Sequence, residues 1–224
     1  MPGVTDKIDF KRTLAAYRAR PGEFSVIDMP ELRYLMIDGQ GDPNTSPAFA
    51  EAIESLYPLA YRLKFASKRI LGRDYAVPPL EALWWAEDMR AFTSARDKHE
   101  WQWTLMLMVP EWIAPEMFAE AVAELGAKRP PARLADIRLE GLTEGRCVQT
   151  LHIGSFEDET AVLARMHEEV IPGLGLRLTG RHHEIYLSDF RRVPPERQRT
   201  ILRQPVVAAQ PASDPDTGRA DPPL

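Results

Sequence analysis

The segment Arg181–Ser188 holds the residue best suited to carry chemistry. Side chains alternate along a strand, so His182, Glu184 and Tyr186 are predicted to share one face. A carboxylate among aromatic neighbours loses solvation, which raises its pKa toward the range useful for acid–base catalysis. Glu184 is therefore the leading candidate for a general base. The alternative is that Glu184 only pairs with an arginine of a neighbouring strand.

A set of aromatic residues could hold a ligand. Tryptophan and tyrosine rings bind flat, apolar or cationic molecules by stacking and cation–π attraction. Each ring could instead be ordinary core. Trp84 and Trp85 are adjacent, so one indole could fill the core while the other faces a groove. The set comprises Tyr57, Tyr61, Trp84, Trp85, Trp101, Trp103 and Tyr186.

The remaining polar motifs argue against several other chemistries. His182 shares a face with Glu184, and His152 lies on a predicted neighbouring strand, but His167-Glu168 has no second histidine four residues later. We expect no metal site and no cofactor, and interpret the histidines as hydrogen-bonded structural groups. The glycine turns near Gly39 and Gly154 match neither the P-loop nor the dinucleotide pattern. Cys147 sits mid-strand, unlike a reactive thiol.

The elements that must position these residues occur twice. Residues 31–86 and 145–188 both run strand, glycine turn, helix and strand, and Glu81, Trp84 and Trp85 fall where the second copy has Glu184 and Tyr186. Two fused halves leave a seam between them, and a seam can hold a ligand. Lys128–Pro131 is the predicted boundary between the halves.

Local patterns predict the individual elements. Ser46-Pro47 starts a long helix with an apolar stripe from Phe49 to Leu63, and Gly72 stops it. Ser155 and Asp158 resemble a capping box ahead of a second helix. Further expectations are a helix within 6–20, strands at 24–29, 34–37, 80–86, 101–110 and 181–188, a helix at 115–126, a hairpin of 134–142 with 146–153, and an edge strand at 201–207.

Composition indicates an ordinary globular protein. The 224 residues are 44% hydrophobic and 27% charged, with a net charge of −5, which fits one large domain or two small ones. No segment is long and apolar enough for a membrane span or a signal peptide, and one cysteine suits a reducing compartment. We expect a cytoplasmic protein that binds a small molecule, without a nucleic-acid or membrane partner; the oligomeric state stays open.

Three segments resemble the GyrI-like proteins: 34–43, 79–85 and 181–189, with Asp-Gly-x-Gly-Asp-Pro and His-His-Glu-Ile-Tyr-Leu-Ser-Asp as their more specific parts. The resemblance covers roughly residues 6–207 and is greatest to freestanding members without a DNA-binding domain. It implies an α+β fold of two pseudo-symmetric βαβ-type (SHS2) halves, about 20–129 and 132–207. These would form one domain, 1–207, as an antiparallel sheet with helices on one side and a central ligand cleft. Residues 208–224 would be a disordered tail.

The resemblance also implies a function. Family transcription factors use a glutamate at this position to engage cationic aromatic drugs, whereas some freestanding members hydrolyse the strained cyclopropane of DNA-alkylating natural products. By this likeness Glu184 would activate water and Tyr186 would hold the flat ligand. A non-catalytic sensor or sequestering protein is the alternative, and a gyrase inhibitor is less favoured because no strongly acidic surface is evident. The ligand contacts would be Tyr57, Tyr61, Glu81, Trp84, Trp85, Trp103, His152 and His182.

Overall fold

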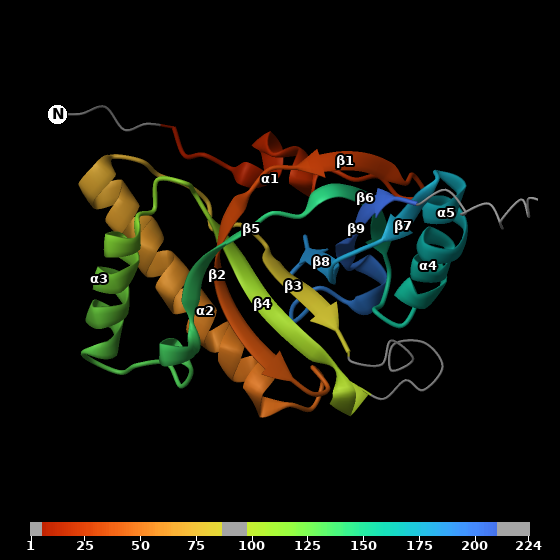
Figure 1. Ribbon diagram of the computed structural model, residues 1–224. Helices are drawn as coiled ribbons and strands as arrows, with labels where there is room; N and C mark the ends of the chain where they lie inside the picture. Colours follow the sequence, from red (N-terminus) through yellow and green to blue (C-terminus); the bar gives the residue numbers. More distant parts are fainter. Residues whose placement is uncertain (1–5, 87–97, 210–224) are drawn as a thin grey trace, which may run out of the picture.

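A computed structural model describes residues 6–86 and 98–209, which form an α+β structure around one large antiparallel sheet (Figure 1). The predicted disordered tail lies almost wholly outside the described residues. The strands are β1 (Ser25–Met29), β2 (Leu32–Gln40), β3 (Leu80–Trp85), β4 (Gln102–Val109), β5 (Arg138–Leu142), β6 (Gly145–Ile153), β7 (Leu176–Leu178), β8 (His182–Tyr186) and β9 (Arg199–Ala208). The helices are α1 (Phe10–Thr13), α2 (Pro47–Ala66), α3 (Pro115–Gly126), α4 (Glu159–Arg165) and α5 (Ile171–Gly173).

The strand order confirms the duplicated architecture. The order is β1-β6-β9-β8-β3-β4-β2-β5, with β7 added to β9. From the centre outward, β3-β4-β2 belong to the first half and β8-β9-β6 to the second. Strands β3 and β8 therefore lie side by side at the seam, where Ala82 pairs with Glu184 and Trp84 with His182.

The two halves exchange their outermost strands, which corrects two predictions. β5 pairs with β2 of the first half, whereas β1 pairs with β6 of the second. The hairpin predicted for 134–142 and 146–153 is therefore wrong: the two strands follow one another in the chain but bind opposite ends of the sheet. The strand predicted at 201–207 is present as β9, but its predicted edge position is wrong, because β9 lies between β6 and β8.

The face that carries α2 and α3 contains the largest core. α2 begins with Pro47 in its first turn, as predicted, and continues through a wider turn, Ser67–Leu71, to Gly72 at φ +67°. Its buried stripe, which includes Phe49, Leu56 and Leu63, packs on alternate residues of β2, β3 and β4. α4 and α5 cover the same face of the second half, where Met166 packs on Leu202 of β9. Helices thus cover one face at both ends (Figure 1).

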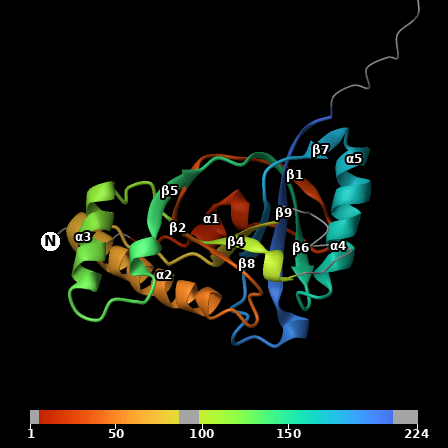
Figure 2. The same cartoon turned by 60° about the horizontal axis from the view of Figure 1, so that its bottom comes forward.

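The N-terminal segment covers the opposite face of the sheet. The helix predicted within 6–20 is reduced to α1 and a single turn at Ala15–Tyr17, because Leu14 between them is extended (φ −87°, ψ 133°). This break lets Tyr17 pack among Tyr34, Met106 and Ile185. Figure 2 shows α1 against the sheet between the β2 and β9 sides. No helix among the described residues is long and apolar enough to cross a membrane.

Candidate functional site

The carboxylate of Glu184 lies on the helix-covered face at the seam. Its side chain retains 14% exposure, and its Oε2 accepts a hydrogen bond from the Tyr186 hydroxyl at 2.8 Å. In the described part of the chain, the basic side chain that reaches it is His182, whose Nε2 lies 3.6 Å from Oε1. The structural alternative, an arginine partner, is therefore not what the described residues provide.

Tyr186 joins the two halves through hydrogen bonds. Its hydroxyl donates to Glu184 and accepts from the indole Nε1 of Trp84 at 3.1 Å, across the β3–β8 pair. Burial, followed by the neighbouring negative charge of Glu184, raises the pKa of Tyr186 well above its usual value. The phenol therefore stays protonated and keeps Glu184 in one orientation. The predicted grouping of Glu184, Tyr186 and Trp84 is present in the structure.

A second carboxyl, that of Glu159, faces the same cluster. Glu159 begins α4, is only 4% exposed, accepts a hydrogen bond from Thr200, and has no hydrogen-bond partner for Oε1. Burial and the nearby charge of Glu184 raise its pKa well above the usual value. Sequence reasoning missed Glu159. The available signal was its position four residues before Leu163, on the apolar side of the predicted helix.

The histidines of this face have different roles. His152 pairs with Thr200 in the sheet, and its Nε2 lies 3.0 Å from the Ser155 carbonyl, so it supports the turn before α4. His182 packs edge-on against His167 with ring centroids 6.3 Å apart. Burial, followed by proximity to His182, lowers the pKa of His167 to about 4. His182 is therefore at the cluster, whereas His152 is structural.

Aromatic rings surround Tyr186 on the same face. Phe156 and Phe190 meet its ring edge-on at centroid distances of 5.8 and 5.4 Å. Trp84 stacks on Phe49 at 6.0 Å and meets Trp101 at 5.7 Å. These contacts supply the apolar surroundings predicted for Glu184. Phe156 and Phe190 were not anticipated, because they lie in loops rather than in periodic segments.

Trp103 belongs to the core of this face rather than to the cluster. It is fully buried, packs edge-on against Phe49 at 5.1 Å, and lies over Gly39. A Cβ at Gly39 would come within 2.1 Å of the indole, so only glycine fits beneath this ring.

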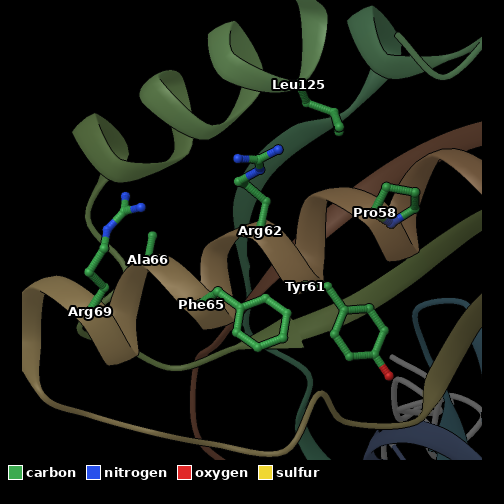
Figure 3. Close-up of a pocket in the computed structure, with 7 residues that line it drawn as sticks. All are labelled: Pro58, Tyr61, Arg62, Phe65, Ala66, Arg69 and Leu125. Atoms are coloured by element: carbon green, nitrogen blue, oxygen red, sulfur yellow. The ribbon is translucent and has the colours of Figure 1, made fainter. Parts of the chain in front are cut away.

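Tyr57 and Tyr61 line the side of α2. Their rings stack at 6.4 Å, and Tyr61 stacks on Phe65 at the same distance. Arg191, from the loop after β8, lies 5.6 Å above Tyr57. Tyr61 is 47% exposed and borders an open groove of about 330 Å³ between α2 and α3 (Figure 3). The lining of that groove does not include Glu184 or Tyr186.

Two predicted ligand contacts lie on the opposite face of the sheet. Trp85 points away from Trp84 and is covered by the Arg181 guanidinium, 3.5 Å from the ring centroid. Glu81 is 1% exposed and accepts hydrogen bonds from Tyr17 at 2.6 Å and Tyr34 at 3.3 Å. The structure therefore does not bring Glu81 or Trp85 to Glu184. Both lie an odd number of residues from Trp84 along β3, and such residues point to the other face of the sheet.

Glu81 is one end of a buried ionic network. Its Oε2 lies 2.9 Å from His183 Nε2, and His183 Nδ1 lies 2.9 Å from Glu144. Glu144 is also bound by Arg203 at 2.9 Å. The negative partners raise the pKa of His183 to about 8 against the effect of burial, and His183 with Arg203 holds the pKa of Glu144 at about 2. We call Glu81, Glu144, His183 and Arg203 the buried network.

The described residues contain no group of three or more potential ligands able to hold a metal ion. The site geometry is instead that of paired acids beside a hydrogen-bonded phenol. The model of the GyrI-like small-molecule-binding domain matches residues 22–206. The chain belongs to this family.

Solved GyrI-like relatives cover almost the whole chain. An uncharacterized conserved protein from Listeria innocua is 38% identical, with a TM-score of 0.81, and a hydrolase from the same organism is 36% identical, with a TM-score of 0.78. Each alignment covers 90% of this chain and all of the other. The C-terminal domain of EcmrR shares the fold alone, at 11% identity and a TM-score of 0.52, over 84% of this chain and 98% of that one. No curated protein sequence matches the chain.

Proposed function

We propose that this GyrI-like protein is a hydrolase of flat, electrophilic small molecules, and that its substrates are cyclopropane-containing genotoxins. The observation that carries the proposal is the chain of hydrogen bonds from Trp84 to Tyr186 to Glu184, which fixes a partly exposed carboxylate at the seam. The hydrolase from Listeria innocua, 36% identical along its whole length, supports an enzymatic activity.

Glu184 acts as the general base in this proposal. Its free oxygen accepts a proton from a water molecule while the water oxygen attacks the cyclopropyl CH₂. The C–O bond forms as one ring C–C bond breaks, and the released electron pair moves through the conjugated system to a carbonyl oxygen. That oxygen takes up a proton, so the net change is the addition of one water molecule.

The residues present are sufficient for this reaction. Ring strain already makes the carbon electrophilic, so the protein needs to supply a base and a fixed geometry. A positioned general base contributes about 10²–10⁴-fold, and orientation of the two reactants contributes further acceleration. Phe156, which is 40% exposed and packs on Tyr186, provides apolar surface for a flat ring system beside the carboxylate. A role of this kind fits the predicted cytoplasmic location.

The test is incubation of the purified protein with a cyclopropane-bearing alkylating natural product in ¹⁸O-labelled water. Repeated turnover giving a product heavier by one labelled water supports the proposal. Glu184→Gln should then lower kcat by about 10²–10⁴-fold. The matched control is Glu157→Gln, an exposed glutamate of the turn before α4, which should leave kcat unchanged.

A different result would indicate a non-catalytic binding protein. Intact ligand together with quenched tryptophan fluorescence on titration would show a binding protein rather than a hydrolase. Glu184→Gln would in that case weaken the binding of a cationic ligand by removing its counter-charge.

A further inference from the structure

Glu159 is a buried acid that keeps one oxygen unsatisfied. The turn before α4 is already closed by Ser155 and Asp158, whose side chains hydrogen bond at 2.7 Å. Glu159 follows them, turns inward and leaves Oε1 without a partner. An unsatisfied buried carboxyl is costly, and such groups concentrate at functional sites.

Among the described residues, the groups that face Glu159 include no cation. From β8 come Glu184 and Tyr186, and β9 supplies Thr200, which donates a hydrogen bond. His182, two residues before Glu184, contacts His167, and burial followed by proximity to His182 lowers the pKa of His167 to about 4. Burial and the negative charge of Glu184 therefore favour the protonated form of Glu159 and raise its pKa well above the usual value.

We propose that Glu159 is the proton donor of the reaction in which Glu184 is the base. This inference rests on the proposed function. As water loses a proton to Glu184 and attacks the cyclopropyl carbon, the electron pair of the broken C–C bond reaches the conjugated carbonyl oxygen. Glu159 gives its proton to that oxygen. Glu184 is then protonated and Glu159 ionised, and transfer of the proton from Glu184 to Glu159 restores the starting state.

The proposal gives the two carboxyls on this face different roles. A single carboxylate can accept the proton of water but has none to donate at the same moment. A pair whose surroundings separate their affinities for the proton can do both, as acid and base. The positions suit the division: Glu184 is partly exposed and bound by a phenol, whereas Glu159 is buried.

The first test compares Glu159→Gln with the wild type over a series of substrates. We expect kcat to fall by about 10²-fold, and the alkaline limb of the wild-type pH profile to disappear. The loss should shrink for substrates whose ring-opened anion is more stable, because these need less protonation. An equal loss for every substrate, with the alkaline limb kept, would overturn the assignment. Glu157→Gln is the matched control.

The second test needs no activity. Difference infrared spectroscopy of the free protein, labelled with ¹³C-glutamate, should show a protonated carboxyl band at pH 7 that Glu159→Gln removes. In Glu184→Gln the band should titrate at lower pH, since one neighbouring charge is gone. Absence of the band overturns this inference even if the wild type turns over. Failure of turnover with the band present would instead contradict the proposed function.

Discussion

Both faces of strands β3 and β8 carry acidic and histidine side chains, but these side chains have different partners on the two faces. On one face, the buried network joins Glu81, His183, Glu144 and Arg203 by contacts of 2.9 Å. On the other face, Glu184 and Glu159 lie together without a basic partner of comparable closeness among the described residues, and Glu159 Oε1 accepts no hydrogen bond. His183 and Glu184 are adjacent in the chain, yet His183 lies among charges of opposite sign and Glu184 lies beside a second acid.

The difference separates polar groups that hold the fold together from polar groups that we propose to act on a ligand. In the buried network two acids meet two bases, so the charges cancel and the groups fix the N-terminal segment through Tyr17 and the Ala16 carbonyl. The Glu184 face retains uncancelled acid and unused hydrogen-bonding capacity, which a bound molecule and water can take up. Four measurements can break or sharpen this comparison.

The largest effect is expected from Arg203→Met. The substitution leaves Glu144 buried without its cation, and removing one member of a buried ion pair costs about 3–5 kcal/mol. The free energy of unfolding, measured with urea, should fall by that amount. Arg199→Met on the same strand, where the side chain is exposed, is the control and should change it by less than about 0.5 kcal/mol. Equal effects would contradict the structural role of the network.

The pH dependence of stability should come next. The folded-state pKa of His183 is about 8, above its unfolded value, so its contribution is complete below about pH 6.5 and is lost as pH rises through 8. The expected loss is about 2 kcal/mol. Glu144, with a folded pKa of about 2, loses its contribution only as pH falls from about 4.5 toward 2.

Urea unfolding of the wild type between pH 6 and 9 measures this slope. In His183→Gln the alkaline slope should be absent, although the variant is less stable at every pH in that range. A slope that persists in the variant would assign it to another group.

A gain in stability is expected from Glu159→Gln. Because the pKa of Glu159 is raised in the folded state, its contribution turns unfavourable as pH rises above about 4.5, and an amide avoids that penalty. We expect about 1 kcal/mol of added stability at pH 7, the size typical of relieving strain at a functional site. Glu81→Gln should do the opposite, since Glu81 balances His183. The measurement is the Tm of both variants by calorimetry. A lower Tm in both Glu159→Gln and Glu81→Gln would contradict the comparison.

The smallest effect distinguishes the adjacent tryptophans. Trp84→Phe removes the N–H that holds Tyr186, and we expect kcat/KM for the cyclopropane substrate to fall about fivefold, equivalent to about 1 kcal/mol. Trp85→Phe, on the other face beneath Arg181, should change kcat/KM less than twofold. A larger loss in Trp85→Phe than in Trp84→Phe would place the ligand on the face opposite Glu184.

The repeat and the seam could be predicted because they rest on strong local signals. Glycine turns, the Ser46-Pro47 helix start and alternation in Trp101–Pro110 all gave elements close to those observed. Alternation on Arg181–Ser188 also placed Glu184 with Tyr186. These features depend on residues near one another in the chain, which a sequence displays directly.

The pairing partners of β5 and β9 could not be predicted from local sequence signals. Short connections favour hairpins, so Thr143-Glu144-Gly145 indicated one, yet Glu144 is held by His183 and Arg203 from other strands. Glu81 was grouped with Glu184 by its place in the repeat, while its strand parity put it on the other face. Glu159 gave only the signal of an acid on the apolar side of a helix. The strand pairing and the positions of Glu81 and Glu159 all depend on residues far away in the chain.

The exchange of β1 and β5 makes each half incomplete by itself. The first half lends β1 to the sheet of the second and receives β5 in return, so either half alone would expose an unpaired edge at β2 or β6. The two halves are thus linked through the sheet as well as through the chain segment between α3 and β5, where we place the boundary. A chain cut at that segment would yield two fragments that need each other to close their sheets. Each fragment would supply the outermost strand that the other lacks.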